Sequence, residues 1–157
     1  KFMLDLAANF KRKGKKFAFI FVGNGELYDE CMNRVKREHL EDYVVFMGQR
    51  KDVADILLDS DIFVLPSFYE GMPLSVIEAQ AAGLPCVIAD HVTKEVDFEL
   101  GLIHRGKLSD SINKWTEIIE DAILQPHPDR NRILEAIHKK GFDVSDFQRN
   151  LCNIYRK

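Results

Sequence analysis

The chain has 157 residues, a formal net charge of −3 and 46% hydrophobic residues. One domain is the default for roughly 150 residues, and a domain of that size buries a full core. The slightly acidic balance argues against a general nucleic-acid binder, which would usually be strongly basic. The longest apolar run, residues 17–22, is far shorter than the ~20 residues that a membrane span needs.

The cysteines and histidines show no metal-binding or disulfide pattern. Cys31, Cys86 and Cys152 are widely spaced and form no CxxC pair, which suggests neither a disulfide framework nor a zinc site. The five histidines share no i, i+4 pairing of the kind that places two ligands on one helix face. A reducing environment fits this cysteine usage, so we expect a cytoplasmic location.

Apolar residues follow helical spacing from Phe2 to Phe10, and no N-cap residue precedes them. This beginning indicates a chain cut from a larger protein. Short apolar runs then alternate with helical stretches. The predicted strands cover residues 17–22, 44–47, 62–65, 86–89 and 102–104. The later predicted helices cover residues 27–38, 53–58, 73–82, 112–124, 131–139 and 144–155.

The predicted strands are apolar throughout, which is typical of strands buried on both faces. Their alternation with helices predicts an open α/β sheet of parallel strands with helices on both faces. In such sheets, ligands bind beyond the carboxyl ends of the strands, near a switch in strand order. The candidate ligand-binding loops are therefore residues 23–26, 48–52, 66–73 and 90–95.

The most informative of these loops leads into the helix predicted over residues 73–82. Pro73 can occupy the first helical position, where its missing N–H costs nothing. The amides of Leu74, Ser75 and Val76 would then be unpaired donors at the positive end of a helix. Such an end suits a phosphate or another anion.

Two carboxylates flank this helix start. Glu70 precedes it, and Glu78 lies one turn inside, where side chains lean back toward the N-terminus. Both would repel phosphate but can accept hydrogen bonds from hydroxyl groups, while Gly71 allows a ligand to approach the backbone. A nucleotide sugar, with a central diphosphate and polyols at both ends, satisfies these features. A purely structural strand–turn–helix remains the alternative.

Seven residues separate Glu70 and Glu78 within EGMPLSVIEAQAAGLPCV. This segment resembles the donor-binding signature of retaining glycosyltransferases with the GT-B fold, a family that includes sucrose synthase and many bacterial polysaccharide transferases. The segments VGNGEL, VVFMGQRKDVADIL, DIFVLPSFYEG and VTKEVDFELGLIHR resemble further parts of that family in order, the last in the version of bacterial capsule and exopolysaccharide enzymes. The resemblance extends over residues 1–157 and is most specific over residues 61–90.

The resemblance implies a role for each matching residue. Glu78 would hold the ribose hydroxyls, and Glu70 would be the catalytic residue that contacts the transferred sugar. The amides of Leu74 and Ser75 would hold the diphosphate. The other implied substrate-binding residues are Gly23, Asn24, Gln49, Arg50, Gly71 and Met72. The first two would line the diphosphate or sugar face, and the backbone around the next two would hold the base.

The resemblance also implies that no metal or other cofactor is needed, because the helix end and basic side chains stabilise the leaving diphosphate. A UDP-sugar is the favoured donor. The implied acceptor is a glycan or a lipid-linked glycan, bound by an N-terminal domain that residues 1–157 lack, and nucleic acid is not expected as a partner. Peripheral association of the full-length protein with the inner face of the plasma membrane stays open.

Residues 1–157 are therefore expected to form one Rossmann-like donor-binding domain, the C-terminal half of a GT-B enzyme, inactive by itself. The family's first strand and its phosphate-binding Arg and Lys would lie upstream of Lys1. Without that strand, the remaining five would follow the order 2-1-3-4-5 if the gap closes. The family's GGxPE loop is replaced by residues 91–95.

Other functions remain open. A non-catalytic module that senses a nucleotide sugar would carry the same residues. VGNGE matches the first two glycines of a dinucleotide fingerprint, but Tyr28 stands where the third glycine belongs. The basic run over residues 11–16 is interpreted as a solvated helix end that complements the helix dipole, with a membrane or nucleic-acid patch as the alternative.

Overall fold

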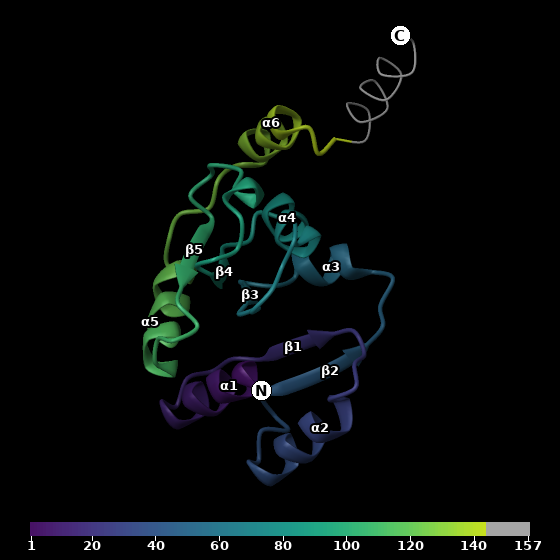
Figure 1. The fold of residues 1–157 in the computed structure, drawn as a ribbon, viewed down its shortest axis with the longest axis vertical. Coiled ribbons are helices and arrows are strands. Elements are labelled where there is room, and N and C mark those ends of the chain that lie inside the picture. Colours follow the sequence, from purple (N-terminus) through teal and green to yellow (C-terminus); the bar gives the residue numbers. More distant parts are fainter. Residues whose placement is uncertain (144–157) are drawn as a thin grey trace.

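The computed structural model describes residues 1–143, which form parallel strands flanked by helices (Figure 1). The strands are β1 (Phe19–Val22), β2 (Val44–Gly48), β3 (Phe63–Leu65), β4 (Cys86–Ala89) and β5 (Ile103–Gly106). The helices are α1 (Phe2–Arg12), α2 (Tyr28–Arg37), α3 (Val53–Leu58), α4 (Leu74–Ala81), the 3₁₀ turn η1 (Lys94–Val96), α5 (Ile112–Ile123) and α6 (Arg130–Lys140). The predicted helix over residues 144–155 lies outside the described residues.

The predicted α/β class is confirmed, but the strands form two parallel sheets instead of one. β1 pairs with β2, and β3, β4 and β5 form a second sheet in that order. The order 2-1-3-4-5 therefore holds within each sheet, while the expected neighbour pair of β1 and β3 does not form. Helix packing joins the two sheets. One core cluster combines Leu6 and Phe10 of α1, Val87 of β4, and Trp115 and Ile119 of α5.

Helices cover both faces of the second sheet (Figure 1). Cys86 and Ile88 of β4 pack with side chains of α3 and α4, whereas Val87 packs with α1 and α5. Each of the four β4 residues is buried. The prediction of two-sided burial is correct for this strand.

The first sheet is covered on one face only. Phe19 and Phe21 pack against α1 and α2, which both lie on that side. The side chains that point the other way are partly exposed: Ile20 43%, Val22 39%, Val45 42% and Met47 37%. Two-sided burial is therefore wrong for β1 and β2, because α1 and α2 cover the same face.

β1 begins at Phe19 and not at residue 17, because the chain reaches the ladder only there. The ring of Phe17 stacks on Tyr43 with centroids 4.9 Å apart. The Phe19 N–H then donates to the Tyr43 carbonyl at 2.8 Å. Aromatic packing thus takes the place of strand pairing over the first two residues of the predicted strand.

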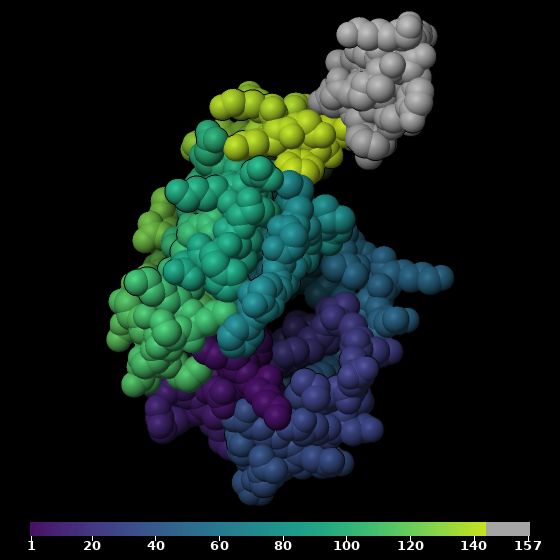
Figure 2. Space-filling model, viewed as in Figure 1, coloured from purple at the N-terminus to yellow at the C-terminus, as the bar shows by residue number. Residues whose placement is uncertain are grey.

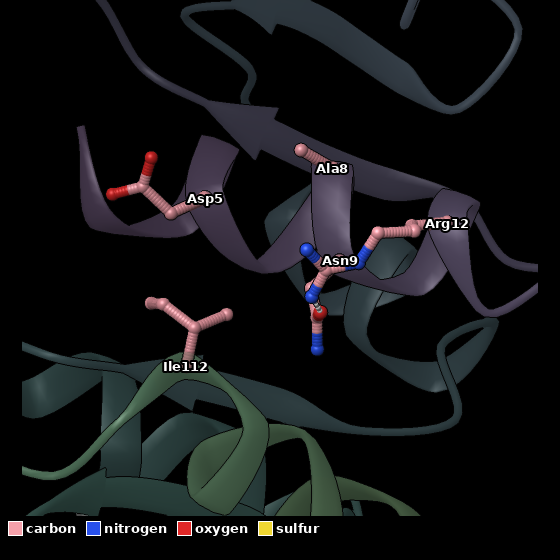
Figure 3. A pocket seen from close by; sticks show the side chains of 5 residues that line it. All are labelled: Asp5, Ala8, Asn9, Arg12 and Ile112. Atoms are coloured by element: carbon pink, nitrogen blue, oxygen red, sulfur yellow. Dashed lines mark hydrogen bonds between the residues drawn. The ribbon is translucent and has the colours of Figure 1, made fainter.

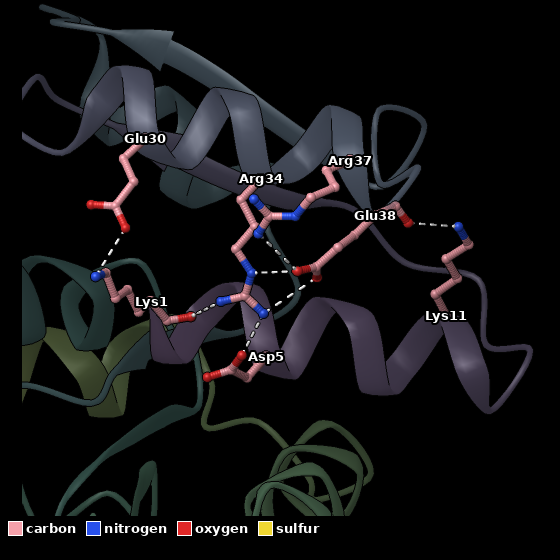
Figure 4. A network of polar contacts seen from close by, with 7 residues as sticks. All are labelled: Lys1, Asp5, Lys11, Glu30, Arg34, Arg37 and Glu38. Carbon is pink, nitrogen blue, oxygen red and sulfur yellow. Dashed lines mark hydrogen bonds and ion pairs between the residues drawn. The ribbon is translucent and has the colours of Figure 1, made fainter.

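A polar network fixes α2 on α1 (Figure 4). The Arg34 guanidinium of α2 donates to Asp5 of α1, to the Glu38 carboxylate at 2.8 Å and to the Lys1 carbonyl at 3.2 Å. The hydrogen bond from Arg34 lowers the pKa of Glu38. Lys1 Nζ lies 2.9 Å from Glu30 Oε1, so a second ion pair joins the two segments near the start of α1.

Much of the basic run has structural partners. Lys15 and Lys13 lie 2.9 and 3.7 Å from the two carboxylate oxygens of Glu120 on α5. Lys11 Nζ donates to the carbonyl of His39 at 2.6 Å. The space-filling view shows this purple N-terminal segment packed against the green part of the chain (Figure 2). Among residues 1–143, none of the helices combines the length and apolar character needed to cross a membrane.

Candidate functional site

The carboxyl ends of β1 and β2 bring two predicted binding segments together. Gly23 has a φ of 123°, which favours glycine, and its N–H donates to the Gly48 carbonyl at 2.6 Å. A Cβ on Gly48 would lie 3.5 Å from Asn24 Oδ1. The predicted residues Gly23 and Asn24 therefore lie beside the turn that leads into Gln49.

Arg50 follows this turn, and its side chain is already engaged. The guanidinium binds the Asp52 carboxylate through two hydrogen bonds, Nε to Oδ1 at 2.8 Å and Nη2 to Oδ2 at 2.5 Å. The hydrogen bond from Arg50 lowers the pKa of Asp52. Such a bidentate pair fixes the guanidinium plane, so Arg50 can offer a ligand its backbone more readily than its charge.

The helix start at α4 follows β3 after a turn over residues 66–73. Pro73 occupies the N-cap and not the predicted first helical position, with a ψ of 98°. The Val76 N–H donates to the Pro73 carbonyl at 3.0 Å, so the prediction that its amide is unpaired is wrong. Leu74 is exposed and Ser75 is half-buried, and their two amides precede the first bonded one. Two amides, those of Leu74 and Ser75, therefore remain as candidate hydrogen-bond donors to an anion.

The two carboxylates lie at this helix as their spacing predicts. Glu70, Gly71 and Met72 are exposed in the turn, and a Cβ on Gly71 would meet nothing within 4 Å. Glu78 is exposed on α4 and lines a hollow of about 960 Å³ between α3, α4 and α6. Lys51, from the loop that carries Gln49 and Arg50, lines the same hollow. The structure therefore places Glu78 and the loop after β2 around one space.

Several residues of the hollow were missed by sequence reasoning. His127, which precedes α6, and Arg130, the first residue of α6, both line it. His127 Nδ1 lies 3.2 Å from the Gly83 carbonyl oxygen. Ile133 also packs beside Gly83, because a Cβ built on Gly83 would lie 3.2 Å from Ile133 Cδ1. These contacts join segments more than 40 residues apart, so no local spacing signals them.

A second hollow, of about 370 Å³, does not contain any predicted site residue (Figure 3). It lies between α1 and the start of α5 and is lined by Asp5, Ala8, Asn9, Arg12 and Ile112. Asn9 is held there by Arg12, which donates to its Oδ1, and by Thr116, which accepts from its Nδ2 at 2.8 Å. Its side-chain amide thus bonds within α1 through Oδ1 and joins α1 to α5 through Nδ2.

Metal-binding side chains do not gather in the described part of the chain. Within residues 1–143, no group of three or more His, Cys, Asp or Glu side chains is placed to hold a metal ion. Cys86 is buried, and burial raises the pKa of its thiol to about 12. A thiol with such a pKa stays protonated, which makes it a poor ligand or nucleophile.

Sequence comparisons identify glycosyltransferases as relatives of this chain. The family described as "Glycosyl transferases group 1" matches residues 1–122. The glycosyltransferase EpsF of Bacillus subtilis is 38% identical over 98% of this chain and 40% of its own length. An Escherichia coli enzyme named UDP-Gal:alpha-D-GlcNAc-diphosphoundecaprenol alpha-1,3-galactosyltransferase is 34% identical over 68% of this chain and 29% of its own. The chain thus spans less than half the length of these relatives.

Solved structures agree on the fold. The Staphylococcus aureus protein TarM, in a crystal structure with UDP, superimposes with a TM-score of 0.75 at 20% identity. That match covers 99% of this chain and 32% of TarM. WaaG, a glycosyltransferase involved in lipopolysaccharide biosynthesis, gives a TM-score of 0.63 at 19% identity, over 88% of this chain and 38% of its own. Together with the family match over residues 1–122, these findings show that the chain belongs to the group 1 family of glycosyl transferases.

Proposed function

We propose that this chain binds the nucleotide-diphosphate-sugar donor of a retaining glycosyltransferase, with a UDP-sugar as the favoured donor. One observation carries the proposal. The exposed N-terminus of α4 lies at the carboxyl end of β3 with Glu70 before it and Glu78 one turn inside it. Anion-binding amides between two hydroxyl-binding carboxylates fit a diphosphate with a sugar at each end.

The diphosphate is proposed to bind at the start of α4. The amides of Leu74 and Ser75 precede the first bonded amide of the helix, and the dipole of the helix favours negative charge there. Gly71 leaves the approach open, because even a Cβ at this position would meet nothing within 4 Å. The helix end therefore stabilises the charge of the diphosphate without a metal ion.

The nucleoside is proposed to occupy the hollow beside α4. Glu78 lines this space and would accept hydrogen bonds from the ribose hydroxyls. The base would lie against the backbone of Gln49 and Arg50, whose guanidinium is turned away to Asp52. A contact through the backbone would read the edge of the base without using that charge.

The transferred sugar is proposed to lie between Glu70 and the glycine turn after β1. Gly23 and Asn24 line its other side, next to the Gly48 carbonyl. Positive charge develops near the anomeric carbon during glycosyl transfer, and a carboxylate at that place stabilises it. Glu70 is the candidate for this role because it is exposed and outside the helix.

The acceptor and the setting are proposals for the full-length protein. The E. coli relative is named for transfer from UDP-Gal to a diphosphoundecaprenol-linked sugar, and the TarM crystal structure contains UDP. These relatives support a glycan or lipid-linked acceptor, bound by a part of the protein outside this chain. We further propose that the full-length protein acts in polysaccharide synthesis in the cytoplasm, at the inner face of the plasma membrane.

The test is titration of UDP into the full-length protein, followed by the Glu78→Ala variant. One charge-assisted hydrogen bond is worth roughly 1.5–3 kcal/mol, so the variant should bind UDP at least about tenfold more weakly. Glu135→Ala is the matched control, because Glu135 is also exposed on a helix but lies outside the hollow. Equal affinities of the two variants would refute the ribose role of Glu78.

Transfer is tested separately with Glu70→Gln. This variant should lose more turnover than UDP affinity, because its contact is assigned to the reacting sugar. The anomeric configuration of the product, determined by NMR, should match that of the donor. A full-length protein that binds UDP but transfers no sugar from any donor tested would favour the sensing module instead.

A further inference from the structure

The loop of residues 90–98, which follows β4, is packed against α4. Val92 and Val96 are buried in one core cluster with Val76 of that helix. Leu65 at the end of β3 pairs with Ile88 of β4, so the loop leaves the sheet beside the turn that carries Glu70. The loop therefore lies next to the proposed donor site.

Gln80 of α4 holds the far half of this loop. Its side chain is fully buried, and Nε2 donates to the Val96 carbonyl at 2.6 Å. Its Oε1 accepts the Phe98 N–H at 3.1 Å. A side chain that satisfies two buried backbone groups on one loop fixes the path of that loop, because either group left alone would be costly.

Arg105 of β5 holds the near half. Its Nη1 donates to the carbonyls of Val92 at 2.6 Å and Asp90 at 3.2 Å, and Nη2 donates to Thr93 at 3.4 Å. Three carbonyls around one guanidinium fix the first turn of the loop. Two side chains from two different elements thus fix its backbone at both ends.

The loop also presents ionisable side chains to solvent. Its inward-facing residues anchor it, while those between them are exposed: Asp90, His91, Lys94 and Glu95. The placement of these four follows from the backbone that Gln80 and Arg105 hold. A shift of that backbone would move these charged groups relative to α4.

We propose that Gln80 is a positioning residue for sugar transfer, which with Arg105 sets the loop of residues 90–98 against the donor. The inference rests on the proposed donor site. Gln80 lies two residues after Glu78, so the helix that contacts the ribose also anchors the loop. Because Gln80 itself is buried, it acts through the loop and does not touch the donor.

The test uses the full-length protein and the variant Gln80→Met, which keeps the volume and removes both loop hydrogen bonds. Misplacing a reacting geometry can cost up to about a hundredfold in rate, so kcat should fall by about tenfold or more. UDP affinity should change less than about twofold, because the α4 amides and Glu78 remain. Amide hydrogen exchange at Phe98 should become faster.

Asn9→Leu is the matched control, because it removes another buried amide that bonds across two helices, at 2.8 Å to Thr116. It should alter neither kcat nor the exchange of Phe98 at a temperature where both variants are folded. Gln80→Glu adds a pH signature. Its carboxyl can donate to Val96 only when protonated, so its kcat relative to wild type should rise as the pH falls.

Three results would overturn the proposal. If Gln80→Met matches Asn9→Leu in kcat while the wild type binds UDP and transfers sugar, Gln80 does not position the reaction and the donor site stands. If the wild type does not bind UDP, the proposed function fails and the inference fails with it. A Gln80→Glu profile parallel to wild type would also contradict the loop role.

Discussion

The two sheets of this fold differ in how many of their faces helices cover. β4 is buried on both sides, whereas β1 and β2 are packed on one side and leave Ile20, Val22, Val45 and Met47 partly exposed on the other. The sequences FIFV and CVIA look alike as strands. An apolar run therefore indicates a strand, while the crossovers around it decide how many of its faces are buried.

The difference also divides the proposed site. The one-sided sheet supplies the glycine turn and the loop around Gln49, which rest on a single layer of helices. The two-sided sheet supplies the start of α4 and the loop of residues 90–98, which are packed from two sides. The transferred sugar is thus assigned to the junction of the two parts, between Glu70 before α4 and the glycine turn after β1.

The largest expected effect comes from truncating one isoleucine in each sheet. Ile88→Ala in β4 should lower the free energy of unfolding by about 2–5 kcal/mol, because the side chain is fully buried between helices and strand. Ile20→Ala in β1 should cost about 1 kcal/mol or less, because 43% of Ile20 is exposed. Urea denaturation measures both. Equal losses would mean that the open face of β1 and β2 is covered in solution.

A smaller effect is expected from adding one methyl group at a glycine. A Cβ on Gly106 in β5 would lie 2.7 Å from the buried ring of Trp115, so Gly106→Ala should destabilise the fold by about 1–3 kcal/mol. Gly25→Ala, near the end of β1, should change stability by less than about 0.5 kcal/mol, since its Cβ would meet nothing within 4 Å. Thermal unfolding of both variants checks this. A harmless Gly106→Ala would show that Trp115 can move.

The polar network that holds α2 on α1 should contribute about 1 kcal/mol to the free energy of unfolding at neutral pH. Arg34 lowers the pKa of Glu38 below its ordinary value of 4.5. The stabilisation is therefore complete above that value and is lost as the pH falls through the lower folded-state pKa. Glu38→Gln should be less stable than wild type at pH 7, and the difference should shrink below about pH 4.5.

Melting temperatures between pH 3 and pH 7 measure this difference. Glu41→Gln, three residues further along the chain, is the control, because Glu41 is exposed and takes no part in the polar network (Figure 4). A Glu38→Gln variant that is as stable as wild type at pH 7 would show that the polar network does not stabilise the packing of α2 on α1.

The smallest expected effect is that of chelation. The charge of the diphosphate is assigned to the α4 amides, and residues 1–143 contain no metal-binding cluster. Adding EDTA to the full-length protein should therefore leave its transfer rate unchanged. Activity lost on chelation and restored by magnesium or manganese would contradict a metal-free site.

The sequence predicted the positions of the helices and strands better than it predicted which of their faces are buried. Residues 86–89 were predicted as a strand with the observed bounds, because a short apolar run between turn residues is a local signal. The partial exposure of Ile20 was not predictable in the same way, since it depends on which face α1 and α2 cover. Pro73 was placed one position too far into its helix, because helix ends are set by backbone geometry that the sequence states only loosely.

The candidate site was predictable where its residues lie close together along the chain. The spacing from Glu70 to Glu78 indicated both carboxylates, and the structure places Glu70 before α4 and Glu78 one turn inside it. Gln80 and Arg105 were not recognised, because their partners lie 12 to 18 positions away and only folding brings them together.

Trp115 gives the fold a built-in optical reporter. It is the single tryptophan of the chain, and its ring meets Phe2 of α1 edge-on with centroids 5.1 Å apart while Nε1 donates to the Lys107 carbonyl at 2.8 Å. Its indole is buried where α1, α5 and β5 meet, which is also where the two sheets are joined. A red shift of its fluorescence would therefore signal that the packing of α1 and α5 between the two sheets has opened, before either sheet needs to unfold.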